Sequence, residues 1–110
     1  MKNFVILFRQ GPRVPTADEL ALRQQQVAAW ARSQNAAGHQ LEPRILEPDV
    51  LPRSGGAGAE ARPVTALLFL QAGDLAQAAE IAESHPATRF GATVEVRPWA
   101  SPVAPAAAAR

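Results

Sequence analysis

Apolar side chains gather in a few short stretches of the chain. Residues 2–9 (KNFVILFR) and 64–71 (VTALLFLQ) are rich in aromatic and β-branched or leucine side chains, and residues 92–98 (ATVEVRP) alternate apolar and polar positions. These patterns predict three β-strands. A further stretch, residues 40–51, contains two prolines. Because proline cannot donate to a strand ladder, this stretch predicts at best a short, irregular edge strand.

The first predicted helix begins at a capping-box sequence, Thr16-Ala17-Asp18-Glu19, in which the Thr16 hydroxyl and the Glu19 carboxylate satisfy free amides. It runs to about Ala37, and Gly38 is the expected stop. Its apolar stripe consists of Leu20, Val27, Trp30 and Ala31. The stripe predicts that one side of this helix packs on the rest of the protein, with Trp30 in the core.

A second predicted helix begins at Asp74, with Gln77 in the capping-box position. It ends at His85, because the residue before Pro86 disfavours the helical conformation. Its predicted buried face follows the spacing i, i+3, i+4, i+7 and consists of Leu75, Ala78, Ala79 and Ala82.

The order strand, helix, strand, strand, helix, strand predicts a ferredoxin-like β-α-β-β-α-β fold of the α+β class with an antiparallel sheet. In that topology the first and third strands are central and the other two are edges. We expect one domain over residues 1–99. The glycine-rich residues 52–63 predict a flexible connection, and the Ala/Pro-rich tail, residues 100–110, is expected to be disordered or loosely attached.

Both faces of the two central strands are apolar. In the first strand Phe4, Ile6 and Phe8 face one way, while Val5 and Leu7 face the other. In the third, Val64, Ala66, Leu68 and Leu70 face one way, while Leu67 and Phe69 face the other. Two helices cover only one face, and monomers rarely expose a large apolar patch. The pattern therefore favours a homodimer in which two sheets pack face to face. The alternative is that residues 40–63 fold over the sheet.

Composition narrows the class of protein. The chain has 110 residues, of which 47% are hydrophobic and 19% charged, with no cysteine and a net charge of +1. This balance argues against disulfides and against a general nucleic-acid binder. No apolar run approaches the ~20 residues of a membrane span, and the N-terminus lacks a signal-peptide pattern. We expect a cytoplasmic protein with no membrane association, and abundant alanine and arginine suggest a bacterial source.

His85 is the candidate catalytic residue, because an imidazole can act as acid or base near neutral pH. At the C-terminus of the second helix we expect it to be exposed and the helix dipole to favour the imidazolium form. The alternative is that His85 only caps the last helical carbonyls. His39, after the helix stop, is expected to be a surface turn residue.

Three further residues are candidates for ligand binding. Arg9 and Arg97 end two strands, and Arg97 could point into a cavity and hold a carboxylate or phosphate. The alternative is a solvated charge that protects a sheet edge. Trp99 could line a pocket or attach the tail to a dimer partner. No spacing of His and acidic residues suggests a metal site, and we expect no cofactor.

Several segments together resemble the YCII-related (DGPF-domain) family of small bacterial proteins. The resemblance rests on MKNFVILFR, on AAW and AAG in the first helix, on LEPRILEP, and most heavily on AQAAEIAESHP followed by FGATVEVRPW. It covers residues 1–99 and implies a dimeric α-β barrel built from ferredoxin-like subunits. The family's biochemical activity is in general not established. A histidine-aspartate pair in a pocket has been proposed to be catalytic in some members.

The chain departs from the family in two places. Residues 54–63 read SGGAGAEARP where a DGPF-type motif usually stands. Val27 stands at about the position of the family's histidine, and His85 stands at that of its aspartate. Three functions therefore stay open: a protein that binds a small molecule, a cofactor-independent enzyme of the monooxygenase, isomerase or lyase type using His85, and a ligand-free interaction module.

Overall fold

The computed structural model describes residues 1–47 and 62–100, so nearly all of the predicted flexible connection and of the predicted tail lies outside the described residues. The elements follow the predicted order. They are β1 (Lys2–Arg9), α1 (Ala17–Ala36), β2 (Glu42–Ile45), β3 (Val64–Ala72), α2 (Leu75–Glu83), the short 3-10 helix η1 (Pro86–Phe90) and β4 (Thr93–Pro98).

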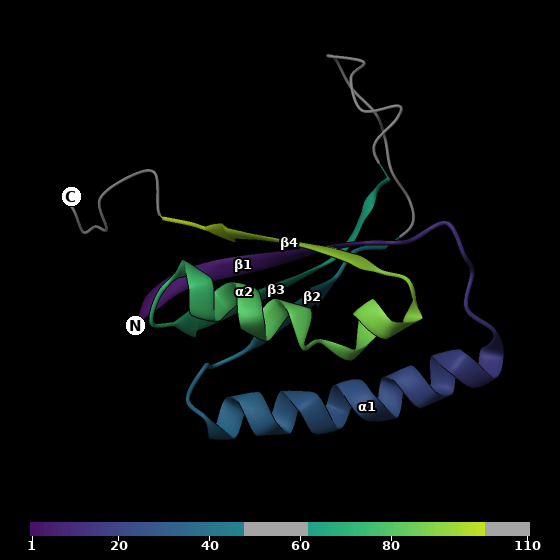
Figure 1. Cartoon of the computed structure of the whole chain (residues 1–110), viewed down its shortest axis with the longest axis horizontal. Helices are drawn as coiled ribbons and strands as arrows, with labels where there is room; N and C mark the ends of the chain where they lie inside the picture. The colour runs from purple at the N-terminus through teal and green to yellow at the C-terminus, as the bar shows by residue number, and fades with distance from the viewer. Residues whose placement is uncertain (48–61, 101–110) are drawn as a thin grey trace, which may run out of the picture.

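The four strands form one antiparallel sheet in the order β2-β3-β1-β4. This order confirms that the first and third strands are central. Both helices lie on the same side of the sheet (Figure 1). The protein is thus an α+β protein compatible with a ferredoxin-like fold. In the part of the chain that the structure describes, no helix is long and apolar enough to cross a membrane.

The predicted edge strand forms, but it is short. β2 has four residues, all exposed, and within residues 1–47 and 62–100 it pairs with β3 alone. Pro43 lies opposite Leu68, and its lack of an amide proton is tolerated because β2 is an edge strand of the described sheet.

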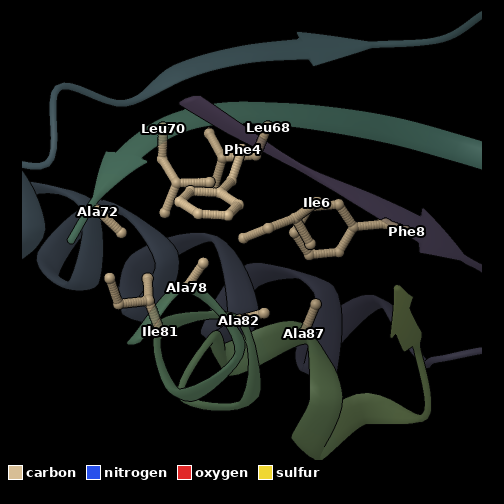
Figure 2. Packing of buried hydrophobic residues seen from close by; sticks show 10 residues of the cluster. All are labelled: Phe4, Ile6, Phe8, Leu68, Leu70, Ala72, Ala78, Ile81, Ala82 and Ala87. Carbon is tan, nitrogen blue, oxygen red and sulfur yellow. The ribbon is translucent and has the colours of Figure 1, made fainter. Parts of the chain in front are cut away.

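Alternation along β1 and β3 divides the sheet into two faces. On the helix side Phe4, Ile6, Phe8, Leu68, Leu70 and Ala72 are buried and Val64 and Ala66 are half-buried. Val5, Leu7, Leu67 and Phe69 on the opposite side are half-buried. The core packs the buried side against α2 and η1, as Figure 2 shows, and consists of Phe4, Ile6, Phe8, Leu68, Leu70, Ala72, Ala78, Ile81, Ala82 and Ala87. We call the opposite side, with Val5, Leu7, Leu67 and Phe69, the open face.

The predicted buried face of α2 is partly wrong. Ala78 and Ala82 are buried and Ala79 is half-buried, but Leu75 is 49% exposed and Ile81 is buried instead. Leu75 is the first residue of α2. Because helical side chains lean toward the N-terminus of their helix, the side chain of Leu75 projects past the end of α2.

α1 starts and ends as the sequence predicts. Thr16 and Glu19 form the reciprocal capping box. At the other end Gly38 adopts a φ of 96°, and the amides of Gly38 and His39 bond back to the carbonyls of Asn35 and Gln34. This is the Schellman arrangement, in which glycine is favoured because its φ is positive.

The stripe of α1 does not enter the core. No residue of α1 is fully buried, and Leu20 is 42% exposed. Val27, Trp30 and Ala31 are half-buried, and Trp30 packs against the edge of the core. α1 is therefore an outer wall that docks on η1, and its apolar stripe faces a space between the helix and the sheet.

Candidate functional site

A cavity of about 530 Å³ separates α1 from the helix side of the sheet. Its apolar walls include Phe8, Val27, Trp30, Leu41 and Leu68. Its polar lining consists of Gln10, Arg23, Gln24, Asn35, Thr65 and His85. A concave, mostly apolar site with a few polar groups is typical of small-molecule binding sites, which span roughly 300 to 1,000 Å³.

His85 lies at the inner wall of this cavity, in the turn between α2 and η1. Its ring packs against two aromatic rings, with the centroids of Phe8 and Trp30 each 4.6 Å from its own. Its Nδ1 accepts a 3.0 Å hydrogen bond from the backbone amide of Ala87, which makes His85 the N-cap of η1. The side chain is therefore fixed by one hydrogen bond and by contacts with two rings.

Three expectations for His85 are wrong. The residue is 7% exposed rather than exposed at a helix end, and its side chain caps the amide of η1 rather than the carbonyls of α2. Burial and then the positive charge of Arg23 together lower the pKa of His85 to about 4, so the expected preference for the imidazolium form is wrong as well. The turn at Pro86 places the imidazole at the edge of the hydrophobic core. The loss of hydration there lowers the pKa by more than the helix dipole could raise it.

The hydrogen bond at Nδ1 also settles where the ring proton lies. Because Nδ1 accepts from an amide, the neutral ring carries its proton on Nε2. Nε2 has no hydrogen-bond partner within residues 1–47 and 62–100. His85 can therefore donate a hydrogen bond to a ligand oxygen, as a neutral imidazole does when it stabilises negative charge. Its predicted acid/base role stays a prediction.

α1 supplies a charge that sequence reasoning missed. Arg23 lines the cavity and lies close enough to His85 for its charge to lower the histidine pKa. Ion pairs with carboxylates are made by Arg9, Arg13, Arg44 and Arg97, and in the described ranges Arg23 makes none. The available signal was spacing, since Arg23 falls three residues after Leu20 and four before Val27, within the apolar stripe.

The other predicted ligand-binding residues lie elsewhere. Arg97 lies opposite Val5 on the open face, with its side chain 66% exposed and 3.5 Å from Glu95. Arg9 lies 3.8 Å from the same carboxylate, and its Nη1 is buried without a partner in the described part of the chain. Neither arginine lines the cavity that contains His85. Within a single chain, Arg9 and Arg97 therefore do not form one site with His85.

Trp99 also lies on the open face. Its ring packs edge-on against Phe69, with 5.7 Å between centroids, and its backbone amide donates to the carbonyl of Asn3. The indole is 44% exposed. It does not line the cavity that contains His85, and instead extends the apolar surface of the open face.

The prediction for His39 is wrong. Its side chain is buried, and its Nδ1 donates to the carbonyl of Gln71 over 2.9 Å, while the amide of Gln71 donates to the carbonyl of His39 over 2.8 Å. The reversal at Gly38 turns the chain against β3, which places His39 in a structural role beside the sheet.

Comparison with protein-family models finds no match, and comparison with curated proteins finds no relative. Among residues 1–47 and 62–100, no group of three or more His, Asp or Glu side chains is arranged to hold a metal ion.

Proposed function

We propose that this protein binds a small organic molecule in the cavity between α1 and the sheet. One observation carries the proposal: a space of about 530 Å³ lies beside the core and combines apolar walls with the free Nε2–H of His85. A folded chain ordinarily fills such space with side chains. Here α1 stays away from the sheet, and its apolar stripe lines the space instead.

We further propose that the chain is a YCII-related bacterial protein of the cytoplasm. The resemblance is supported by one feature of the site. Val27 and His85, the positions that the resemblance matches to the family's histidine and aspartate, both line the cavity. They come from α1 and from the turn after α2, which are far apart in the sequence. Two residues that act together on a ligand must line the same pocket, and these two positions meet that requirement.

We also propose that two copies of the chain form a homodimer in which their sheets pack face to face. The result would be a dimeric α-β barrel, and the open face supports it. Its apolar side chains are half-buried, and neither α1 nor α2 covers them. Glu42, Arg44, Glu95 and Arg97 surround these apolar residues. An apolar centre with a charged rim is typical of an interface between proteins.

The alternative of a cofactor-independent enzyme has less support. Its proposed base, His85, has a pKa of about 4 and has committed Nδ1 to a backbone amide. A general base works best when its pKa lies near the operating pH. The third alternative, a ligand-free interaction module, leaves the cavity without a role.

The binding proposal is tested by titrating the protein with 2-naphthoate and following amide and indole signals by NMR. We expect the indole N–H of Trp30 and the amides around Val27 to shift, because both residues line the cavity. Ala31 lines it as well, so Ala31→Phe projects a ring into the space and should weaken binding. Ala29 lies exposed on the other side of α1, so Ala29→Phe should leave binding unchanged.

An absence of any shift would contradict the proposal, and so would either of two other results. One is that the shifts fall only on open-face residues such as Phe69. The other is that Ala31→Phe, shown to be folded by its own spectrum, binds the probe as well as the unaltered protein does.

A further inference from the structure

We propose that the cavity selects an organic anion, a molecule with one carboxylate on a flat apolar body, and that Arg23 and the Nε2–H of His85 bind the carboxylate. This inference rests on the proposed function and adds the chemical class of the ligand.

The ionisable side chains that line the cavity indicate the charge of its ligand. Arg23 and His85 are the ionisable side chains among the lining residues that the structure describes, and no Asp or Glu accompanies them there. With His85 neutral, the lining carries a single positive charge. A positive charge that its surroundings do not neutralise favours a ligand with one negative charge.

Arg23 is placed to bind a carboxylate. Four arginines of the chain pair with glutamates at distances of 2.8 to 3.8 Å, and in the described ranges Arg23 does not. Arg32, Arg62 and Arg89 also lack such a partner there, but they do not line the cavity, whereas Arg23 does. A guanidinium presents parallel N–H donors that match the two oxygens of a carboxylate. The cavity wall is mostly apolar, and its low dielectric strengthens this attraction relative to that on an open surface.

His85 supplies the complementary donor. Its Nε2–H is left free by the bond at Nδ1, and the rings of Phe8 and Trp30 hold it in place. One cationic donor and one neutral donor suit a carboxylate. A doubly charged phosphate would leave its second charge uncompensated in an apolar cavity, at a large desolvation cost.

The body of the ligand is defined by the remaining walls. Val27, Trp30 and Ala31 of α1 face Leu41 and Leu68 from the sheet side. These side chains offer apolar contact on two opposing sides, which fits a flat ring system better than a hydroxyl-rich one. The volume of about 530 Å³ leaves room for a bicyclic ring.

The test compares 2-naphthoate with 2-naphthamide, which differ in charge and hardly in shape, by isothermal titration calorimetry at neutral pH. We expect the carboxylate to bind at least about tenfold more tightly than the amide, the difference that one charge-assisted contact supplies. Arg23→Gln should reduce the affinity for the carboxylate to that for the amide. Arg32→Gln removes an exposed arginine of the same helix and should preserve the difference.

The outcomes separate this inference from the proposed function. Equal affinity for the two probes, or an Arg23→Gln protein that still prefers the carboxylate, overturns the anion inference and leaves small-molecule binding in place. Failure of both probes to bind the unaltered protein overturns both. Binding of both probes with a preference that depends on Arg23 and not on Arg32 supports both.

Discussion

His85 makes the stability of the protein depend on pH, because its ring is neutral in the folded state. Its folded pKa is about 4, below the 6.5 of an unperturbed histidine. The unfolded state therefore takes up a proton before the folded state does, and stability is lost as pH falls from about 6.5 to 4. The stabilisation is fully present above pH 6.5. We expect this one group to remove about 3 kcal/mol of unfolding free energy between pH 7 and pH 4.

Urea unfolding at a series of pH values measures this loss, with His85→Asn as the matched control. Asparagine is a good N-cap and can accept from the amide of Ala87, but it does not titrate. Because carboxylates titrate in both proteins, the difference between the two curves isolates His85. Parallel curves would show that His85 is not buried in its neutral form.

Single residues also mark the limit of what the sequence predicts. Thr16, Gly38 and Asp74 act through their own backbone and near neighbours, so their capping roles follow from local spacing. His39 and His85 were expected at the surface because each follows a helix, yet tertiary contacts with β3, Phe8 and Trp30 bury them. Burial of a turn residue depends on where the chain goes next, which local patterns do not encode.

At the scale of elements, α1 is held to α2 by a side-chain hydrogen bond. The indole Nε1–H of Trp30 donates to the hydroxyl of Ser84 over 2.8 Å, and that hydroxyl donates to the carbonyl of Ile81 over 2.6 Å. Trp30→Phe, Ser84→Ala and the double variant form a mutant cycle. We expect a coupling free energy of about 1 kcal/mol from urea unfolding, the net value of one such bond.

The control for this cycle pairs Trp30→Phe with Thr93→Ala, an exposed threonine that lies opposite Arg9 on the open face. That pair should be additive, because Thr93 lies on the side of the sheet away from α1 and no hydrogen bond joins the two side chains. Additivity of the Trp30 and Ser84 changes, within about 0.3 kcal/mol, would show that the bond does not hold α1 in place.

The elements themselves were largely predictable, and their packing was not. Alternation in β1 and β3, together with capping signals in α1 and α2, predicts the order and the central strands, because each pattern reflects contacts within one element. The same patterns placed the stripe of α1 against the core. The stripe faces a cavity instead, and this depends on how far α1 lies from the sheet. Arg23 lies within that stripe, and it lines a cavity only because α1 is separated from the sheet.

At the scale of the whole molecule, the open face predicts self-association. Leu7 lies at its centre, opposite Leu67 on one side and Glu95 on the other. Leu7→Lys places a charge in the proposed interface, while Glu95 offers the new ammonium a partner within the monomer. Light scattering after gel filtration should give twice the 11.7 kDa chain mass for the unaltered protein and the single-chain mass for Leu7→Lys.

Leu22 of α1 is 47% exposed on the helix side, so Leu22→Lys is the matched control and should stay dimeric. Urea unfolding adds an independent readout. A dimer that couples folding to association becomes more stable as protein concentration rises, and this dependence should vanish in Leu7→Lys. A single-chain mass for the unaltered protein at all concentrations would rule out the sheet-to-sheet dimer. The open face, with half-buried Val5, Leu7 and Phe69, would then either be left exposed by the monomer or be covered by residues 40–63, the alternative that the sequence leaves open.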